Sequence, residues 1–140
     1  MAELCVDASV ALDLLLPSER TPAVDVLWTQ WLTEGTALIA PPFFFVEVAS
    51  VLRNKVFLRR VSPEHGEEAF RQFLNMPVQR VEFEGIHERA WRLAVELGRP
   101  EAYDSQYLAV AEHRGCELWT SDHRLYRAVA QVFPWVRLAT

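Results

Sequence analysis

The organisation of the chain is set near its start by the stretch LCVDASVALDLLL, residues 4–16. Residues 4–6 form a short apolar run that predicts a buried strand, and this run ends at Asp7. Residues 9–16 then follow helical periodicity, which Pro17 stops. A strand that passes directly into a helix, with an acid at the junction, indicates an α/β fold.

The same alternation of short strands and helices continues along the chain. Further strands are predicted at residues 37–40, 81–83 and 117–120, with an edge strand at 136–138. Helices are predicted from Pro22, capped by Thr21, to Gly35, and at residues 43–59, 63–75, 87–97, 103–114 and 122–132. We therefore expect one domain over residues 1–140, an α/β/α sandwich around a mostly parallel sheet. Ligands of such sheets gather beyond the carboxyl ends of the strands.

Composition narrows the class of protein. The chain has 140 residues, about half of them apolar, which suits a single core. No apolar run approaches the roughly 20 residues of a membrane span and the start lacks a secretory signal, so we expect a cytoplasmic protein without a membrane partner. Cys5 and Cys116 have no ligand spacing and are read as buried free thiols. The net charge of −5 argues against a nucleic-acid partner, unless bound cations neutralise some of the acids.

Two acids lie where parallel strands end. Asp7 closes the first strand and Asp122 lies just after the fourth, so their positions favour a shared cleft at one edge of the sheet. Taken alone, Asp122 is also a plausible N-cap for the helix that contains Leu125. The cleft and the cap both remain open at this point.

Two further acids lie on the apolar faces of helices. Asp104 shares its face with Tyr107 and Leu108, and Glu47 shares its face with Phe43. A first-turn acid that complements the helix dipole would also explain Asp104. A buried unpaired carboxylate is costly, however, and a bound cation or a buried arginine offsets that cost. Carboxylate oxygens are hard ligands that suit Mg²⁺ and Mn²⁺, and a cluster of them can hold one or two such ions.

Four stretches together resemble the PIN domain, over nearly the full length of the chain. They are residues 6–9, 41–52, 102–112 and 118–125. The chain is most similar to the small VapC-type toxins of bacterial toxin–antitoxin pairs. The resemblance implies a Mg²⁺- or Mn²⁺-dependent endoribonuclease with a five-stranded sheet, a homodimer, and an antitoxin whose C-terminal segment covers the active-site groove. It makes four acids the catalytic and metal-binding residues and two hydroxyl residues their supports: Asp7, Glu47, Asp104 and Asp122, with Ser9 and Thr120.

Several basic residues are candidates for binding the RNA substrate. His123 and Arg124 adjoin Asp122 and are expected to reach a phosphate. Arg53 and Lys55 follow Glu47 by one to two helical turns and could line the RNA groove, although a solvated helix face explains them equally well.

Apolar side chains suggest where a partner protein would dock. Trp28, Trp31 and residues 43–45 are candidates for an exposed apolar helix surface that a hydrophobic segment of the antitoxin covers. The two tryptophans are equally compatible with a place in the core.

Three functions other than an RNA-cutting nuclease fit parts of the sequence. A magnesium-dependent phosphatase-like hydrolase of the haloacid dehalogenase type needs a second Asp two residues after the first, where this chain has Ser9. A phosphoryl-receiver module uses a lysine after a late strand, whereas Lys55, the only lysine, falls in a predicted helix. A catalytically silent PIN-like module that only binds RNA or protein is the third alternative, and the presence of all four acids makes it less attractive.

Overall fold

The computed structural model describes residues 2–16 and 22–139, so the expected stop at Pro17 and cap at Thr21 lie outside the described residues. A five-stranded sheet in the order β3-β2-β1-β4-β5 forms the centre, and all four neighbouring pairs of strands are parallel. The strands are β1 (Glu3–Val6), β2 (Ala37–Ala40), β3 (Val78–Arg80), β4 (Glu117–Thr120) and β5 (Val136–Leu138). The predicted parallel α/β/α architecture is therefore confirmed.

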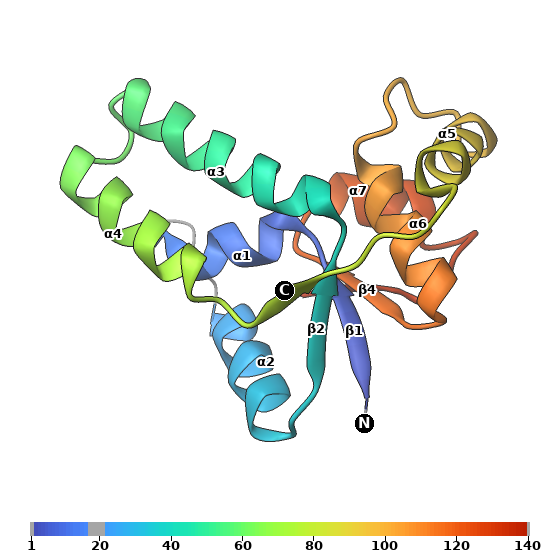
Figure 1. The fold of residues 1–140 in the computed structure, drawn as a ribbon, viewed down its shortest axis with the longest axis horizontal. Coiled ribbons are helices and arrows are strands. Elements are labelled where there is room, and N and C mark those ends of the chain that lie inside the picture. The colour runs from blue at the N-terminus through green and yellow to red at the C-terminus, as the bar shows by residue number, and fades with distance from the viewer. Residues whose placement is uncertain (1, 17–21, 140) are drawn as a thin grey trace.

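Helices cover both faces of the sheet. Figure 1 shows α1 to α4 on one side and α5 to α7 on the other, as right-handed crossovers require when the chain reverses its direction across the sheet. The helices are α1 (Ala8–Leu15), α2 (Pro22–Thr33), α3 (Pro42–Phe57), α4 (Pro63–Leu74), α5 (Ile86–Glu96), α6 (Asp104–Arg114) and α7 (His123–Val129). No helix in the described residues is long and apolar enough to cross a membrane.

Two predicted elements are misplaced. The third strand was predicted at residues 81–83, but β3 comprises Val78–Arg80, and only the amide of Val81 extends its ladder, donating to Ala40. The apolar residues that suggested the strand pack on the core just beyond it, while β3 itself is a short and mostly polar edge. The last helix was predicted to reach Val132, but it ends at Val129, and a turn follows.

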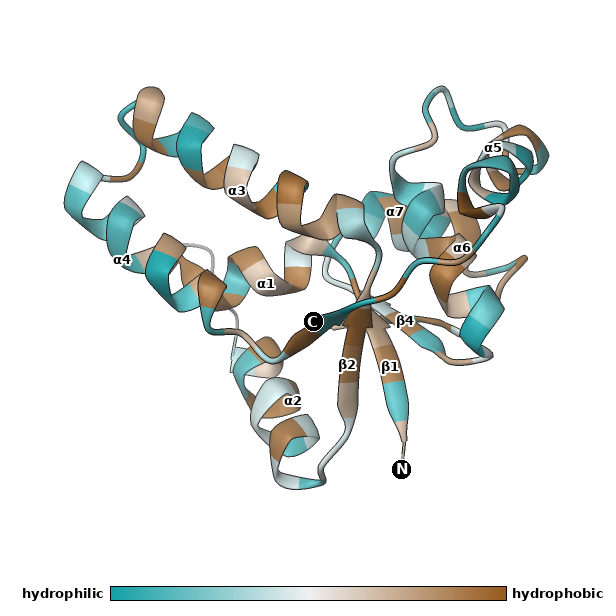
Figure 2. Ribbon diagram, viewed as in Figure 1, coloured by the Kyte–Doolittle hydropathy of each residue, from teal (hydrophilic) through white to brown (hydrophobic). Residues whose placement is uncertain are grey.

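The core includes two side chains that had been expected on a partner-binding surface. Phe44 is fully buried, and Trp31 packs edge-on against Trp119 of β4 at a centroid distance of 5.4 Å. Of the two places left open for Trp31, the core is correct, whereas the expectation that Phe44 is exposed is wrong, because both side chains pack within the core. In Figure 2, β2 and most of α1 are brown, whereas α4 carries much teal on its outer side.

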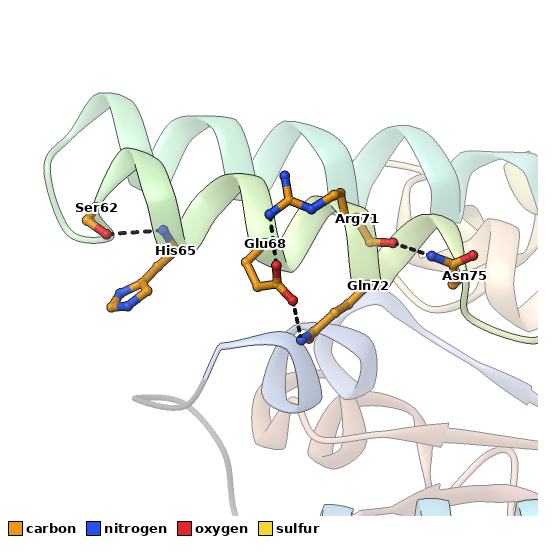
Figure 3. Close-up of polar contacts among 6 residues, drawn as sticks. All are labelled: Ser62, His65, Glu68, Arg71, Gln72 and Asn75. Atoms are coloured by element: carbon orange, nitrogen blue, oxygen red, sulfur yellow. Dashed lines mark hydrogen bonds and ion pairs between the residues drawn. The ribbon is translucent and has the colours of Figure 1, made fainter.

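Helices α3 and α4 form an antiparallel hairpin that projects from the sheet (Figure 1). The two helices lie close together at Gly66, where an added Cβ atom would collide with the side chain of Val56. The outer face of α4 is polar (Figure 3): Ser62 caps the helix by accepting the amide of His65, and Glu68 accepts hydrogen bonds from Arg71 at 2.8 Å and Gln72 at 3.2 Å. This face is therefore solvated and remote from the core.

Candidate active site

The sheet has its topological switch point between β1 and β4. The chain leaves β1 towards β2 on one side and leaves β4 towards β5 on the other, and parallel sheets bind their ligands at the carboxyl ends of two such strands. Asp7 directly follows β1, and Asp122 is the second residue after β4. The topology therefore brings both predicted acids to the place where parallel sheets bind ligands.

Asp7 is a buried N-cap of α1. Its Oδ1 atom accepts the amides of Ser9 at 3.1 Å and Val10 at 3.4 Å, and the hydroxyl of Ser9 at 2.5 Å. Only 5% of the residue is exposed. Burial raises the pKa of the Asp7 carboxyl to about 7, the negative charge of Glu47 adds to this rise, and the hydrogen bonds oppose it. A cation would therefore stabilise the ionised carboxylate at neutral pH.

Ser9 and Thr120 join the corner after β1 to the corner after β4. Their hydroxyl oxygens are 3.2 Å apart. The Ser9 oxygen also accepts the amide of Ser121 at 2.9 Å, and the Thr120 oxygen accepts the amide of Asp122 at 3.0 Å. The two predicted supporting residues thus form a bridge that fixes the backbone on which Asp122 sits.

Asp122 caps α7 in the same manner as Asp7 caps α1. Its Oδ1 atom accepts the amides of Arg124 at 2.9 Å and Leu125 at 3.2 Å, but its side chain is exposed. The N-cap interpretation of Asp122 is therefore correct locally. It does not compete with a role in the site, because the second carboxylate oxygen is not needed for capping.

Glu47 reaches the site from α3. It is half-buried, and the hydroxyl of Tyr107 donates to its Oε1 atom at 2.6 Å. Burial raises the pKa of Glu47, and the negative charges of Asp104 and Asp122 raise it further. Glu47 is therefore within electrostatic reach of the other three acids, because its charge also acts on Asp7.

Tyr107 is a partner of Glu47 that sequence reasoning placed only in the apolar stripe. Burial and the nearby charge of Glu47 raise the pKa of its hydroxyl, so the group stays protonated and donates. A signal existed in the sequence, because a tyrosine on an inward helix face needs a partner for its hydroxyl.

Asp104 begins α6 and pairs with Arg99, which lies in the segment before that helix. The Nη2 atom of Arg99 donates to Oδ2 of Asp104 at 3.1 Å, and about a third of each side chain is exposed. Sequence reasoning missed Arg99, since nothing in its neighbourhood distinguishes it from any other loop arginine. The pair shows that Asp104 attracts a cation in this structure.

The acids suit a metal ion by their chemistry. All four offer hard carboxylate oxygens, and among the described residues the hydrogen bonds of the buried Asp7 come from Ser9 and Val10, neither of which is cationic. Within residues 2–16 and 22–139, no three His, Cys, Asp or Glu side chains are already grouped closely enough to hold an ion. A metal ion held by several of these acids would therefore require their side chains to rotate from the positions described.

The basic candidates lie in two different places. His123 and Arg124 are exposed at the start of α7, directly beside Asp122. Arg53 lies on the projecting hairpin, with its guanidinium 5.7 Å from the ring centroid of Phe57, and Lys55 follows on the same helix. At 1.5 Å per residue, Arg53 is about 9 Å farther along α3 than Glu47.

Comparisons with known proteins agree with this architecture. The family model of the PIN domain matches residues 4–131. Ribonuclease VapC9 of Mycobacterium tuberculosis is 32% identical over 122 residues, which cover 87% of each chain. Ribonuclease VapC12 of the same organism is 32% identical over 122 residues, covering 87% of this chain and 88% of the relative.

A solved structure, a toxin–antitoxin complex from Klebsiella pneumoniae, superposes with a TM-score of 0.66. Its sequence is 18% identical, and the match covers 95% of this chain and 94% of the other. At this identity the likeness concerns the fold. Because the family model covers most of the chain, including all four acids, the chain belongs to the PIN domain family.

Proposed function

We propose that this protein is a metal-dependent endoribonuclease that cuts RNA phosphodiester bonds as the toxin of a toxin–antitoxin pair. The observation that carries the proposal is the pair of acids, Asp7 and Asp122, at the carboxyl ends of the two central strands, tied together by the Ser9–Thr120 bridge. The names of the two ribonuclease relatives, each 32% identical, supply the class of substrate.

The four acids would hold Mg²⁺ or Mn²⁺, and the ion would act on the phosphate being cut. When bound, it supplies an activated water and stabilises negative charge on that phosphate. Tyr107 holds the Glu47 carboxylate in place, and Ser9 and Thr120 hold the corners that carry Asp7 and Asp122. His123 and Arg124, at the exposed rim, would bind RNA phosphates, with Arg53 and Lys55 farther along α3.

A cleavage assay tests the reaction. Purified protein should cut single-stranded RNA with Mg²⁺ or Mn²⁺ and should stop when the metal is chelated. Glu47→Gln should lose activity, whereas Glu68→Gln, the same chemical change on the polar outer face of α4 (Figure 3), should retain it. Intact RNA with both metals would refute the ribonuclease proposal and leave the silent binding module. Release of phosphate from small phosphomonoesters would favour the phosphatase-like hydrolase instead.

Metal binding itself has a separate readout. The thermal midpoint of unfolding should rise when Mg²⁺ or Mn²⁺ is added, because a bound cation stabilises clustered carboxylates only in the folded state. The rise should be absent in Asp7→Asn. An unchanged midpoint of the wild type in millimolar metal would contradict the metal site independently of any activity.

The partner would be a small antitoxin in the cytoplasm, and the toxin would form a homodimer. A basic side chain of the antitoxin can occupy the acidic crevice, as Arg99 already does at Asp104. An apolar segment would pack on α2, where Leu32 is exposed one helical turn after the half-buried Trp28. Expression of the toxin alone should arrest growth, and co-expression of the partner should restore it. Harmless expression of an active nuclease would refute the toxin role.

A further inference from the structure

A cavity opens near helix α5, next to the segments that carry two of the acids. It has a volume of about 640 Å³ and lies between the first turn of α3, the start of α5 and the segment that leads into α6. Two of its lining residues belong to the same elements as the acids: Tyr103 directly precedes Asp104, and Phe43 lies one helical turn before Glu47. The cavity therefore lies next to the chain segments that carry Glu47 and Asp104.

Aromatic rings line this cavity and are open to water. Phe43 and Tyr103 are stacked, with ring centroids 5.3 Å apart and an interplanar angle of 14°. Tyr103 is 56% exposed and Trp91, across the cavity, is 63% exposed. Phe43 also packs edge-on against Tyr107, the residue whose hydroxyl holds Glu47. Exposed, partly pre-stacked rings are the surface that a flat, uncharged ring system covers favourably.

The charges of the lining exclude a phosphate as the occupant. Glu82 and Glu101 line the cavity, and the residues that line it include no lysine or arginine. At its rim the side chains of His87 and Gln106 approach to 3.5 Å and offer both a donor and an acceptor. Carboxylates and a mixed polar rim recognise neutral groups that carry N–H donors, such as the exocyclic amino groups of adenine, cytosine and guanine.

We propose that this cavity holds one unpaired nucleobase of the RNA, adjacent to the phosphate that is cut, and that it favours bases with an exocyclic amino group over uracil. The inference rests on the proposed ribonuclease function. Single-stranded RNA is recognised in this way in general, by bases that leave the strand, stack on aromatic side chains and bond through their edges. The cavity thereby sets where along an RNA the acids act.

The test compares stacking variants on short, labelled single-stranded RNAs with Mg²⁺. Tyr103→Leu and Trp91→Leu should raise KM on the order of 5- to 150-fold, the range expected for loss of one base stack, with little change in kcat. Tyr103→Phe keeps the ring and should resemble the wild type. Phe70→Leu, a change of an exposed aromatic on α4, is the control and should have no effect.

A second set of measurements changes the RNA instead of the protein. Replacement of one amino-bearing base near the cut site by an abasic position should raise KM for the wild type, and replacement by uracil should raise it less. Neither change should matter further in Tyr103→Leu. Both mutated side chains are exposed, so an unchanged thermal midpoint should show that the variants fold.

The outcomes separate this inference from the ribonuclease proposal. If the wild type does not cut RNA, fluorescence anisotropy can still measure its binding to the same RNAs. Equal binding by the wild type and Tyr103→Leu, or no binding by either protein, would overturn the cavity proposal. If the wild type cuts and both leucine variants cut equally well, the cavity proposal fails while the ribonuclease stands. If the leucine variants keep the wild-type KM but sediment differently, the cavity would be a contact between two copies of this chain, and the nucleobase proposal would be overturned.

Discussion

The corner between β1 and α1 and the corner between β4 and α7 are built alike, but water reaches them differently. In each corner an aspartate follows a central strand and caps the next helix through two amides. Asp7 is buried, whereas Asp122 is exposed. The same local pattern therefore yields a carboxyl group that resists ionisation in one corner and a solvated carboxylate in the other. Burial of Asp7, and not its capping geometry, raises the pKa of its carboxyl group.

The largest expected effect is on catalysis, where the two corners should behave alike. Asp7→Asn and Asp122→Asn should each lower RNA cleavage by more than about 100-fold, since loss of a group that only orients a metal ligand already costs about 10- to 100-fold. His65→Ala, on exposed α4, should retain activity. Wild-type rates in either aspartate variant would remove that residue from the site and break the equivalence of the two corners.

The second effect should appear only at the buried corner. Without metal, the pKa of Asp7 rises from 3.8 to about 7 on folding, so its contribution to stability is complete below pH 3.8 and is lost as pH rises through 7. The loss is on the order of a few kcal/mol. Unfolding in denaturant with a chelator, from pH 4 to 8, should show a steeper decline for the wild type than for Asp7→Asn.

Asp122→Asn is the matched comparison for this pH dependence. Because Asp122 is exposed, this variant should follow the wild-type decline. Parallel curves for all three proteins would mean that burial of Asp7 does not govern the metal-free stability.

A smaller effect should follow from cutting the link between the corners. Thr120→Val removes a fully buried hydroxyl that lies within hydrogen-bond distance of the Ser9 hydroxyl and accepts the amide of Asp122. The free energy of unfolding should fall by about 1–3 kcal/mol, because both groups lose a hydrogen-bond partner. Chemical denaturation measures the loss. Thr120→Ser, which keeps the hydroxyl, should recover most of the hydrogen-bonding contribution, and failure to do so would assign the cost to packing of the methyl group.

The smallest effect concerns the cap at the exposed corner. Asp122→Ala should lower the free energy of unfolding by about 1 kcal/mol, because the amides of Arg124 and Leu125 lose their acceptor, whereas Asp122→Asn should keep the cap. Both variants should lack activity. A stability loss in Asp122→Asn equal to that in Asp122→Ala would show that the charge, and not the capping oxygen, matters there.

Local periodicity was sufficient to predict most of the fold, because each strand end and helix start is marked by residues adjacent in the chain. It failed at β3, where the strand is a polar edge and the apolar residues belong to the segment after it. It also could not tell which apolar side chains face out. Trp31 and Phe44 are buried by elements distant in the sequence.

The candidate site was likewise predictable only in part from the sequence. The positions of Asp7 and Asp122 follow from strand ends and sheet topology, which sequence patterns reveal. The pairings of Glu47 with Tyr107 and of Asp104 with Arg99 depend on side-chain rotamers and on how α3, α6 and the loop before α6 meet in space. Such contacts leave no periodic trace in the sequence.

The pairing of β4 with β1 has a consequence for synthesis on the ribosome. Translation produces β1, β2 and β3 in sequence, so these neighbours can pair early, but Thr120 and Asp122 emerge only with and after β4. Until that strand has docked beside β1, at most three of the four acids can come together. The four acids are thus brought together only late in synthesis, once β4 has joined the sheet, and the proposed nuclease site is incomplete beside ribosomal and messenger RNA until then.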